Sequence, residues 1–232
     1  MKQLFLIILS STLLFSCVKK DNSAFVNGRN SFYEKYSEDE IKNHKSILVL
    51  PAANNAVNVE APFYFLSTIS YPIAEKGYYI FPVNLVNRLL EDEGLSDAHM
   101  LNKSSPFKIA KRFGADAILY TTIETWDAKY VGLATIITAG LKYTLKSGKT
   151  GKTIWSTSQT VKYDSNQNLG QQNSIAGLII AMIVNAATDK AMSDSRHYDL
   201  AKSANIIALQ SGMHSLPNGE KFVSKEERTK VK

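Results

Sequence analysis

The sequence predicts a single α/β domain in which helices pack on a mixed sheet, and three observations favour this class. Short apolar runs rich in β-branched residues alternate with helical patterns between residues 46 and 116. Three longer β-type segments then follow one another, and an apolar segment over residues 173–187 comes after them. Alternating strands and helices favour parallel pairing, whereas successive strands favour antiparallel pairing, so one mixed sheet accommodates both parts.

Two strand–helix units are expected in the first part of the chain. The first strand covers residues 46–51, an apolar run closed by proline, and the second covers residues 78–82. A helix with apolar residues at helical spacing lies between them over residues 62–77, and Pro72 predicts a kink or an early stop within it. A second amphipathic helix is expected over residues 83–94, where a glycine ends it.

A third helix is expected after a link at residues 102–105. Ser105 suits the capping position, Pro106 suits the first helical position and Gly114 suits the C-terminal cap. Residues 52–60 are rich in asparagine and alanine and are expected to form a loop.

The middle of the chain predicts successive strands. The three β-type segments cover residues 117–123, 130–145 and 152–163. Residues 147–151 are rich in turn-forming residues, which predicts a hairpin between the last two strands. Gly132 or Gly140 predicts a bulge in the long middle strand. A polar loop over residues 164–172 follows the strands.

The apolar segment at residues 173–187 predicts a helix that is apolar around most of its circumference. Asn185 and Asp189 leave it too short to span a membrane, so it is expected to be a central core helix or an interface helix. Gly177 and Ala181 lie four residues apart and would let a second helix approach closely. The candidate interface residues are Ile175, Gly177, Leu178, Ala181 and Met182, and a homodimer is the expected assembly.

The domain organisation follows from these elements and from a final short helix expected over residues 200–209. We expect a signal peptide at residues 1–16, an acylated N-terminus and flexible tether at 17–45, the α/β domain at 46–212, and a basic, disordered tail at 213–232. The hydrophobic content of 44% allows a core without disulfides. Much of the formal net charge of +6 comes from the lysines and the arginine of the tail.

The first seventeen residues predict export and lipid attachment, with a plain signal peptide followed by an incidental cysteine, or an uncleaved apolar N-terminus, as the alternatives. Lys2 and the short apolar run over residues 4–15 have the charge and length of a secretory leader. The run ends in Leu-Phe-Ser-Cys, which resembles the bacterial lipobox, with cleavage after Ser16. That resemblance implies that the Cys17 thiol carries diacylglycerol and that the new amino terminus carries a palmitate-type acyl group. Cys17 is the only cysteine, so no disulfide within the chain competes for its thiol.

An acylated Cys17 implies that the lipid bilayer is a partner of the chain, because two or more acyl chains anchor a protein stably. Val18 follows the cysteine, and no aspartate stands there to resemble the inner-membrane retention signal. We therefore expect an outer-membrane lipoprotein that faces the periplasm. Because the chain is expected to be exported, we expect no nucleic acid partner.

No catalytic pattern is found, so the chain is not expected to be an enzyme or to hold a cofactor. His44, His99, His197 and His214 are scattered, with no ligand spacing for a metal. Residues 148–153 read Gly-Lys-Thr-Gly-Lys-Thr, but the phosphate loop needs a glycine where Lys146 stands and joins a strand to a helix.

Several other residues have simple structural interpretations. Asp116 precedes a strand and is expected to cap or bond the preceding turn, and the acidic residues 91–93 are expected to be solvated at a helix end. Trp126 and Trp155 are expected to be core or cross-strand residues, with a ligand groove as the alternative.

Three phrases carry a resemblance to known bacterial proteins. They are Ile-Leu-Val-Leu-Pro at residues 47–51, Ala-Lys-Arg-Phe-Gly-Ala-Asp-Ala-Ile-Leu at 110–119, and Thr-Gly-Lys-Thr-Ile-Trp at 150–155. They resemble CsgG, the curli-secretion lipoprotein, and the amino-terminal domain of TolB. Residues 45–217 are similar to a family of bacterial lipoproteins of unknown function that includes a meningococcal surface antigen.

The resemblance implies an α/β domain like the TolB amino-terminal domain or the CsgG periplasmic domain, an outer-membrane anchor, self-association and a CsgG-like lipoprotein partner. The expected function is therefore that of an accessory or assembly component of an envelope transport or secretion complex, acting through protein contacts. These contacts are expected at a sheet edge or at the apolar helix. The alternative is a binding module for a small ligand or a cell-wall polymer.

Overall fold

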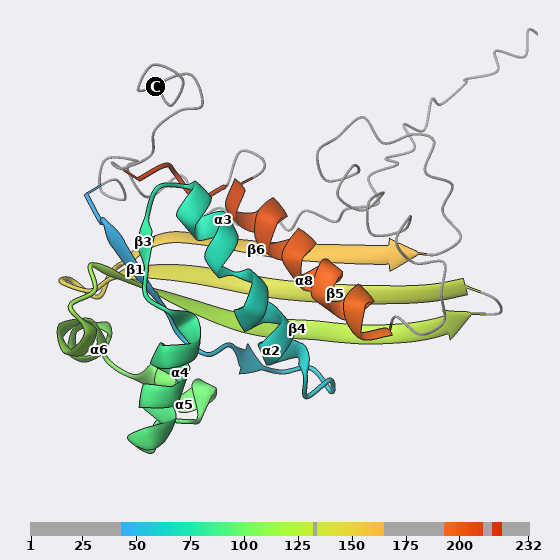
Figure 1. Cartoon of the computed structure of the whole chain (residues 1–232), viewed down its shortest axis with the longest axis horizontal. Coiled ribbons are helices and arrows are strands. Elements are labelled where there is room, and N and C mark those ends of the chain that lie inside the picture. The colour runs from blue at the N-terminus through green and yellow to red at the C-terminus, as the bar shows by residue number, and fades with distance from the viewer. Residues whose placement is uncertain (1–42, 132–133, 165–192, 211–214, 220–232) are drawn as a thin grey trace, which may run out of the picture.

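A computed structural model describes residues 43–131, 134–164, 193–210 and 215–219 (Figure 1). These residues form one α/β domain with a mixed sheet and helices on both of its faces, so the predicted fold class is confirmed. The strands are β1 (Ser46–Val49), β2 (Ala53–Asn54), β3 (Tyr79–Ile80), β4 (Ala117–Val131), β5 (Ala134–Ser147) and β6 (Thr153–Asp164).

The strand order is β3-β1-β4-β5-β6, and the short β2 also pairs with β4. The pairs that involve β1, β2 and β3 are parallel, whereas β4, β5 and β6 form an antiparallel meander. Parallel strands need a crossover connection, and helices supply it in the first half of the chain. The three long strands extend well beyond β1 and β3, as Figure 1 shows.

The boundary between β4 and β5 differs from the prediction. Strand β4 continues to Val131 and β5 begins at Ala134, so the prediction that residue 130 starts the middle strand is wrong. The register shifts after Ile123, where Glu124 is an extra residue and Thr125 pairs with Gly140. The predicted bulge at Gly140 is therefore found, but the extra residue lies on the neighbouring strand; Gly132 lies outside the described residues.

The helices are α2 (Ala61–Thr68), α3 (Ser70–Glu75), α4 (Val83–Asp92), α5 (Ala98–Lys103), α6 (Pro106–Phe113) and α8 (Ser193–Gln210). The expected early stop near Pro72 is confirmed as the break between α2 and α3, because proline cannot donate a backbone hydrogen bond to the preceding turn. Gly114 adopts a positive φ of 70° at the end of α6, as a C-terminal cap requires. Ser105 occupies the predicted capping position, although its side chain makes no capping bond.

Helix α5 was not expected, and the final helix is longer than expected. In α5 the side chain of Asp97 accepts hydrogen bonds from the backbone N–H groups of His99 and Met100, and only Leu101 is buried. With a single buried residue, this helix shows no apolar period. Helix α8 begins at Ser193, seven residues before its predicted start, because its first two turns are polar.

Helices α2, α3 and α8 cover one face of the sheet, called the front face below (Figure 1). The core on this side includes Ile47, Val49, Phe65, Ile69, Leu119, Tyr143, Trp155, Ala204 and Leu209. Asn205 of α8 is fully buried within it; its Oδ1 accepts a hydrogen bond from the Tyr143 hydroxyl at 2.7 Å and its Nδ2 donates to Thr68 Oγ1 at 2.8 Å. This polar contact ties α8 to α2 and β5.

Helices α4, α5 and α6 cover the back face only beside β1 and the start of β4. Their core includes Leu48, Leu50, Val86, Leu90, Leu101, Ile109, Ile118 and Tyr120. Alternate residues of β1 thus enter two different cores, which explains the continuous apolar run at residues 46–51.

Residues 215–219 pack on the domain, although the prediction placed them in the tail. Leu216 is buried, the Tyr78 hydroxyl donates to the carbonyl of Pro217 at 2.8 Å, and the N–H of Gly219 donates to the carbonyl of Lys76 at 2.7 Å. The domain therefore extends beyond the predicted end at residue 212.

Candidate interaction surface

The predicted site residues lie outside the described residues. Cys17 belongs to residues 1–42, and the apolar segment 173–187 belongs to residues 165–192. Ile175, Gly177, Leu178, Ala181 and Met182 are part of that segment. The lipid attachment and the interface predicted at this segment thus stay predictions, and the surfaces below come from the described part of the chain.

The three described histidines each have a different surrounding. Nε2 of His44 lies 3.1 Å from Ser147 Oγ, Nε2 of His99 lies 3.3 Å from the carbonyl of Asn54, and Nδ1 of His197 accepts from Trp126. Within the described ranges, no three His, Cys, Asp or Glu side chains lie close enough together to hold a metal ion. The fourth histidine, at 214, lies outside these ranges.

Asp116 is a structural residue that joins two parallel strands, so the prediction that it caps or bonds the preceding turn is wrong. Its Oδ2 accepts hydrogen bonds at 3.0 Å from the N–H of Lys45, the N–H of Ser46 and the hydroxyl of Ser46. The N–H of Asp116 donates back to Ser46 Oγ, also at 3.0 Å. A carboxylate with these donors fixes the start of β1 beside β4.

The glycine-rich stretch at residues 148–153 forms the predicted hairpin between β5 and β6. The N–H of Ser147 donates to the carbonyl of Lys152 and the N–H of Gly151 donates to that of Ser147. A Cβ atom on Gly148 would lie 2.5 Å from the Ala110 Cβ atom, so the hairpin touches α6 directly. The stretch joins two strands and does not open a helix, which excludes a phosphate loop.

Both tryptophans are buried, as expected for core residues. Trp155 lies in the front core, and Trp126 forms an aromatic cluster with Tyr64 of α2 and His197 of α8. The Tyr64 ring stacks on Trp126 and on His197 with centroid distances of 6.1 and 5.5 Å. The cluster joins β4 to two helices, so its first role is packing.

Two buried tyrosines differ in their partners. Burial raises the pKa of the Tyr143 hydroxyl well above its usual range and raises the pKa of Tyr120 to about 12. The Tyr143 hydroxyl donates to Asn205, whereas the Tyr120 hydroxyl has no hydrogen-bond partner among the described residues. Nζ of Lys146 lies 4.8 Å from the centre of the Tyr120 ring, so the ring itself makes a cation–π contact.

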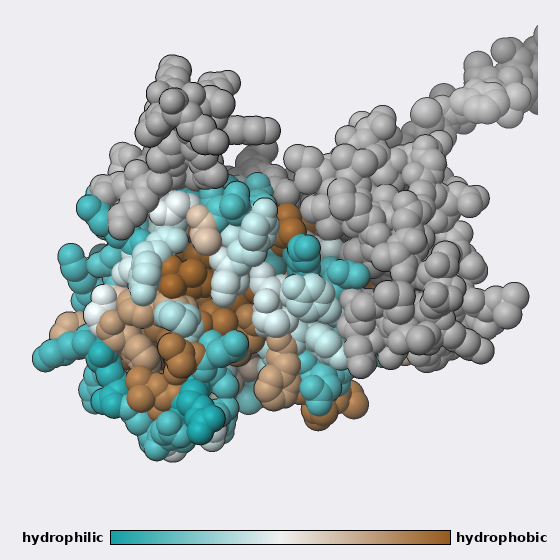
Figure 2. Space-filling model, in the orientation of Figure 1, coloured by the Kyte–Doolittle hydropathy of each residue, from teal (hydrophilic) through white to brown (hydrophobic). Residues whose placement is uncertain are grey.

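An exposed apolar surface lies on α4 and the neighbouring edge strand β3. We call it the α4 surface and define it by Tyr79, Leu85 and Leu89, which are 53%, 68% and 42% exposed. Leu85 and Leu89 share one side of α4 because they are four residues apart, whereas Val86 and Leu90 enter the core. Figure 2 shows apolar side chains gathered over this part of the molecule.

The sequence contained a sign of the α4 surface that its interpretation as a simple amphipathic helix missed. Five apolar residues in the ten of α4 are more than one buried side needs, and two of them remain outside. A second exposed apolar group, called the loop surface, consists of Val57 and Val59 before α2 and Phe63 on it. In the described part of the chain, no helix has the length and apolar character needed to cross a membrane.

Comparison with known proteins gives the family of the chain. A family model described as "Putative lipoprotein GNA1162-like" matches residues 34–219, which include every described element. The chain belongs to the GNA1162-like lipoprotein family. The lipoprotein NMB1124/NMB1162 of Neisseria meningitidis serogroup B is 30% identical over 185 residues, covering 79% of this chain and 83% of that protein.

Solved structures agree with this family. The crystal structure of lipoprotein GNA1162 from Neisseria meningitidis matches with a TM-score of 0.52 and 30% identity, covering 61% of this chain and 96% of that one. The predicted resemblance to the lipoprotein family of a meningococcal antigen is therefore confirmed. A PelC dodecamer from Paraburkholderia phytofirmans is a weaker match, with a TM-score of 0.42, 13% identity, and coverage of 70% of this chain and 84% of that one.

Proposed function

We propose that this GNA1162-like lipoprotein is anchored in the outer membrane through acylated Cys17, faces the periplasm, and acts as an accessory or assembly component of an envelope transport or secretion complex. Membership of a lipoprotein family supports the anchor, together with the lipobox-like sequence that ends at this cysteine. In this proposal the protein works through contacts with other proteins and carries out no reaction of its own.

The α4 surface is the observation that supports contact with another protein. Its three apolar side chains are exposed to water, and burying apolar surface is favourable by about 25 cal/mol per Å². We propose that a second copy of this chain covers it through a two-fold contact between two α4 helices, which gives the expected homodimer.

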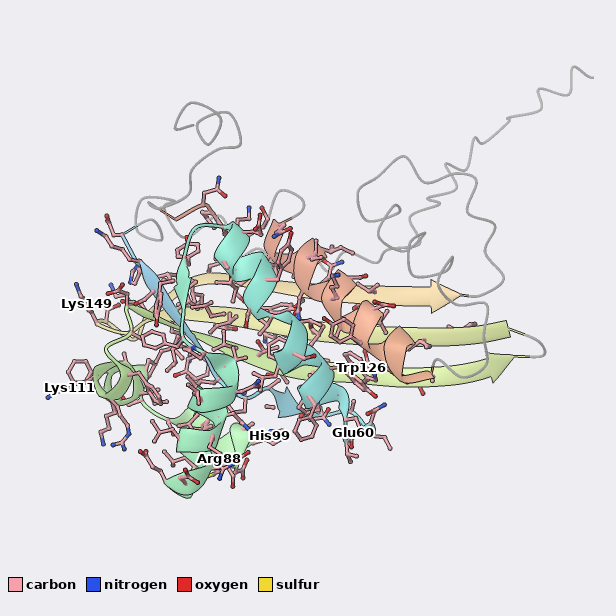
Figure 3. All side chains as sticks on the ribbon, in the orientation of Figure 1. Glu60, Arg88, His99, Lys111, Trp126 and Lys149 are labelled. Carbon is pink, nitrogen blue, oxygen red and sulfur yellow. The ribbon has the colours of Figure 1, made fainter. Side chains whose placement is uncertain are left out.

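The charges on α4 support that occupant. Arg88 and Asp92 are exposed and lie one helical turn apart, with Nε of Arg88 3.9 Å from Oδ1 of Asp92. Figure 3 shows Arg88 projecting from α4. In an antiparallel pair of α4 helices, Leu85 and Leu89 of one copy would meet those of the other. Arg88 and Asp92 of each copy balance one another within their own helix, so this register brings apolar side chains together without adding an unpaired charge to the contact.

Cross-linking in native membranes tests the interface. Replacing Leu85 and Leu89 together by aspartate is expected to remove the dimer band, because a two-fold contact would bring four carboxylates together. The matched control replaces Val57 and Val59 of the loop surface by aspartate and is expected to keep the band.

Two results would contradict this assignment. If the dimer band is lost in the loop-surface variant and kept in the α4 variant, the two copies make contact through the loop surface. A cross-linked CsgG-like lipoprotein at the α4 surface, without a second copy, would replace self-association by a heterologous contact.

Membrane fractionation tests the anchor independently. The Cys17→Ser variant has no thiol to acylate, so we expect it to leave the membrane fraction and appear in the soluble periplasmic fraction. The same amount of protein in the membrane fraction would show that another feature attaches the chain.

A binding module for a cell-wall polymer is the second candidate, and the open part of the back face favours it. Thr125, Lys142, Thr160 and Lys162 are exposed there on neighbouring strands, and they present hydroxyl and ammonium groups on one face of the sheet. Retention of the wild-type chain on insoluble peptidoglycan, with loss in a Thr125→Glu, Thr160→Glu variant, would support this candidate.

A further inference from the structure

Four exposed lysines gather at the end of the domain where α6 and the β5–β6 hairpin meet. Lys108 and Lys111 lie on α6, and Lys149 and Lys152 lie in or beside the hairpin. We call this surface the basic end. Figure 3 shows Lys111 and Lys149 projecting from the same end of the molecule.

The packing of the hairpin against α6 creates this group from residues about forty positions apart. A Cβ atom on Gly148 would lie 2.5 Å from the Cβ atom of Ala110, and one on Gly151 would lie 3.9 Å from Cγ of Pro106. The first approach leaves no room for a side chain at Gly148, and the second is ordinary van der Waals contact between the hairpin and the helix. The hairpin therefore packs directly on α6, and Lys149 and Lys152 remain exposed to solvent.

The basic end lacks counter-charges among the described residues. None of its four lysines forms an ion pair there, and the two acidic groups beside α6 are engaged: Asp116 with the start of β1, and Glu93 with Arg112. Phe107 directly precedes Lys108 on α6 and is 54% exposed. The surface therefore combines uncompensated positive charge with one exposed aromatic ring.

The tether from Cys17 joins the domain at this end. Nε2 of His44 lies 3.1 Å from the hydroxyl of Ser147 at the base of the hairpin, and the N–H of Lys45 donates to Asp116. The described C-terminal residue Gly219 bonds to Lys76, next to β3 and the start of β1. Because the tether enters the domain beside the hairpin, a membrane held by the tether faces the four lysines of the basic end.

We propose that the basic end rests on anionic phospholipid headgroups of the membrane to which the chain is anchored. Lysines within a Debye length of about 8 Å from an anionic surface are attracted to it. Each such lysine raises the membrane partition coefficient roughly fivefold. An exposed apolar ring such as that of Phe107 can insert at the boundary between headgroups and acyl chains, as the apolar residues of interfacial helices do. The location of this contact rests on the anchor proposed at Cys17, but the attraction itself does not need it.

Vesicle co-sedimentation tests the contact without the acyl chains. The mature chain, residues 17–232 with Cys17→Ser, is mixed with vesicles of phosphatidylcholine containing about a third phosphatidylglycerol, or with phosphatidylcholine alone. We expect binding to the anionic vesicles only. Replacing Lys108 and Lys111 by glutamine is expected to weaken that binding by roughly 25-fold.

The matched control removes the same charge from another surface. Lys142→Gln with Lys162→Gln neutralises two exposed lysines of the open back face and is expected to leave binding within about twofold of wild type. Thermal unfolding of the wild-type chain and of the two double variants checks that each is folded. Both variants should remain folded because every substituted lysine is exposed.

Equal weakening by both pairs of substitutions would overturn the proposal, as would equal binding of the wild-type chain to both kinds of vesicle. Binding of the wild-type chain to a soluble polyanion, without binding to anionic vesicles, would also overturn the proposal and would favour a polymer ligand. These outcomes are separate from the anchor, because the vesicle assay uses a chain without acyl groups and the anchor is tested by fractionation of Cys17→Ser in cells.

Discussion

The two faces of the sheet differ in how far helices cover them. On the front face, α2, α3 and α8 lie over the long antiparallel strands (Figure 1). The side chains that point toward these helices include a large apolar and aromatic core, together with the buried polar residues Thr121, Thr157 and Gln159. On the back face, α4, α5 and α6 cover only the parallel part of the sheet and the start of β4. Strand β5 shows the contrast within a few residues: Leu141 and Tyr143 are buried, whereas Lys142 between them is exposed.

This difference indicates that the residues that stabilise the fold and the residues available to bind partners lie on different faces of the sheet. The front face contains the larger core and a buried polar network, whereas the basic end and the exposed strand residues Thr125, Lys142, Thr160 and Lys162 lie on the back face or beside the helices on that side. Substitutions that face α8 should therefore unfold the protein, and substitutions on the open back face should change only what it binds. The predictions below use pairs of residues to test that separation.

The largest expected effect comes from the front core. Phe65 of α2 is fully buried and its ring lies 6.3 Å from that of Tyr143, so Phe65→Ala should lower the free energy of unfolding by about 3–5 kcal/mol. Thr160→Ala on the open back face should change it by less than about 0.5 kcal/mol. Urea denaturation measures both, and comparable losses would contradict the distinction between the faces.

The polar network of the front core should give the next largest effect. Asn205→Ala would leave the buried hydroxyl of Tyr143 without its acceptor and Thr68 without its donor, at a cost of about 2 kcal/mol. Asn87→Ala is the control, since the Asn87 amide donates to Glu91 at the surface. If the two variants melt at the same temperature, the network does not stabilise the fold.

Alkaline pH should weaken the fold through both buried tyrosines. Burial raises the pKa of Tyr120 to about 12 and moves that of Tyr143 in the same direction, from an ordinary value of 10.0. Above this ordinary value the unfolded chain has lost phenolic protons that the folded chain keeps. The free energy of unfolding should therefore fall by about 1.4 kcal/mol per pH unit for each tyrosine.

Denaturation midpoints measured at increasing pH check this expectation. The decline should be absent below the ordinary tyrosine pKa and should become shallower in Tyr143→Phe. A decline of unchanged slope in that variant would assign it to other groups.

The smallest effects on the free energy of unfolding should come from removing single tyrosine hydroxyls. The sign of the effect should differ between Tyr143 on the front face and Tyr120 on the back face. Tyr143→Phe removes a donated hydrogen bond and leaves Oδ1 of Asn205 unpaired, so it should cost about 1 kcal/mol. Tyr120→Phe removes a buried hydroxyl that has no partner in the described part of the chain, so it should be neutral or stabilise by up to about 1 kcal/mol. Calorimetry at neutral pH distinguishes these outcomes, and a loss in Tyr120→Phe matching that in Tyr143→Phe would refute the difference.

Local sequence patterns predict the elements that are set locally. The run at residues 46–51 is buried on both sides, and the hairpin at 147–151 has the turn residues its geometry needs, so both are found where expected. Helix α5 lacks an apolar period, although Asp97 at its start was an available capping signal. Strand β4 was predicted too short because the extra residue Glu124 interrupts its alternation.

The surfaces depend on packing between distant segments and were not predictable in the same way. Apolar residues at helical spacing on α4 do not say which two enter the core, so exposure of Leu85 and Leu89 follows only from the position of the helix on β1. The basic end combines α6 with a hairpin far along the chain, and no local pattern joins them. The lipid attachment is the reverse case, because the lipobox-like sequence predicts it and the described residues do not include it.

Mass spectrometry of the N-terminal peptide of the mature protein, isolated from membranes, is the most direct test of the central claim that this is a lipid-anchored envelope protein. The account predicts a peptide that begins at Cys17, with a diacylglyceryl group on its sulfur and an acyl group on its amine. A peptide with an unmodified Cys17 thiol, or one that still contains residues 1–16, would contradict it.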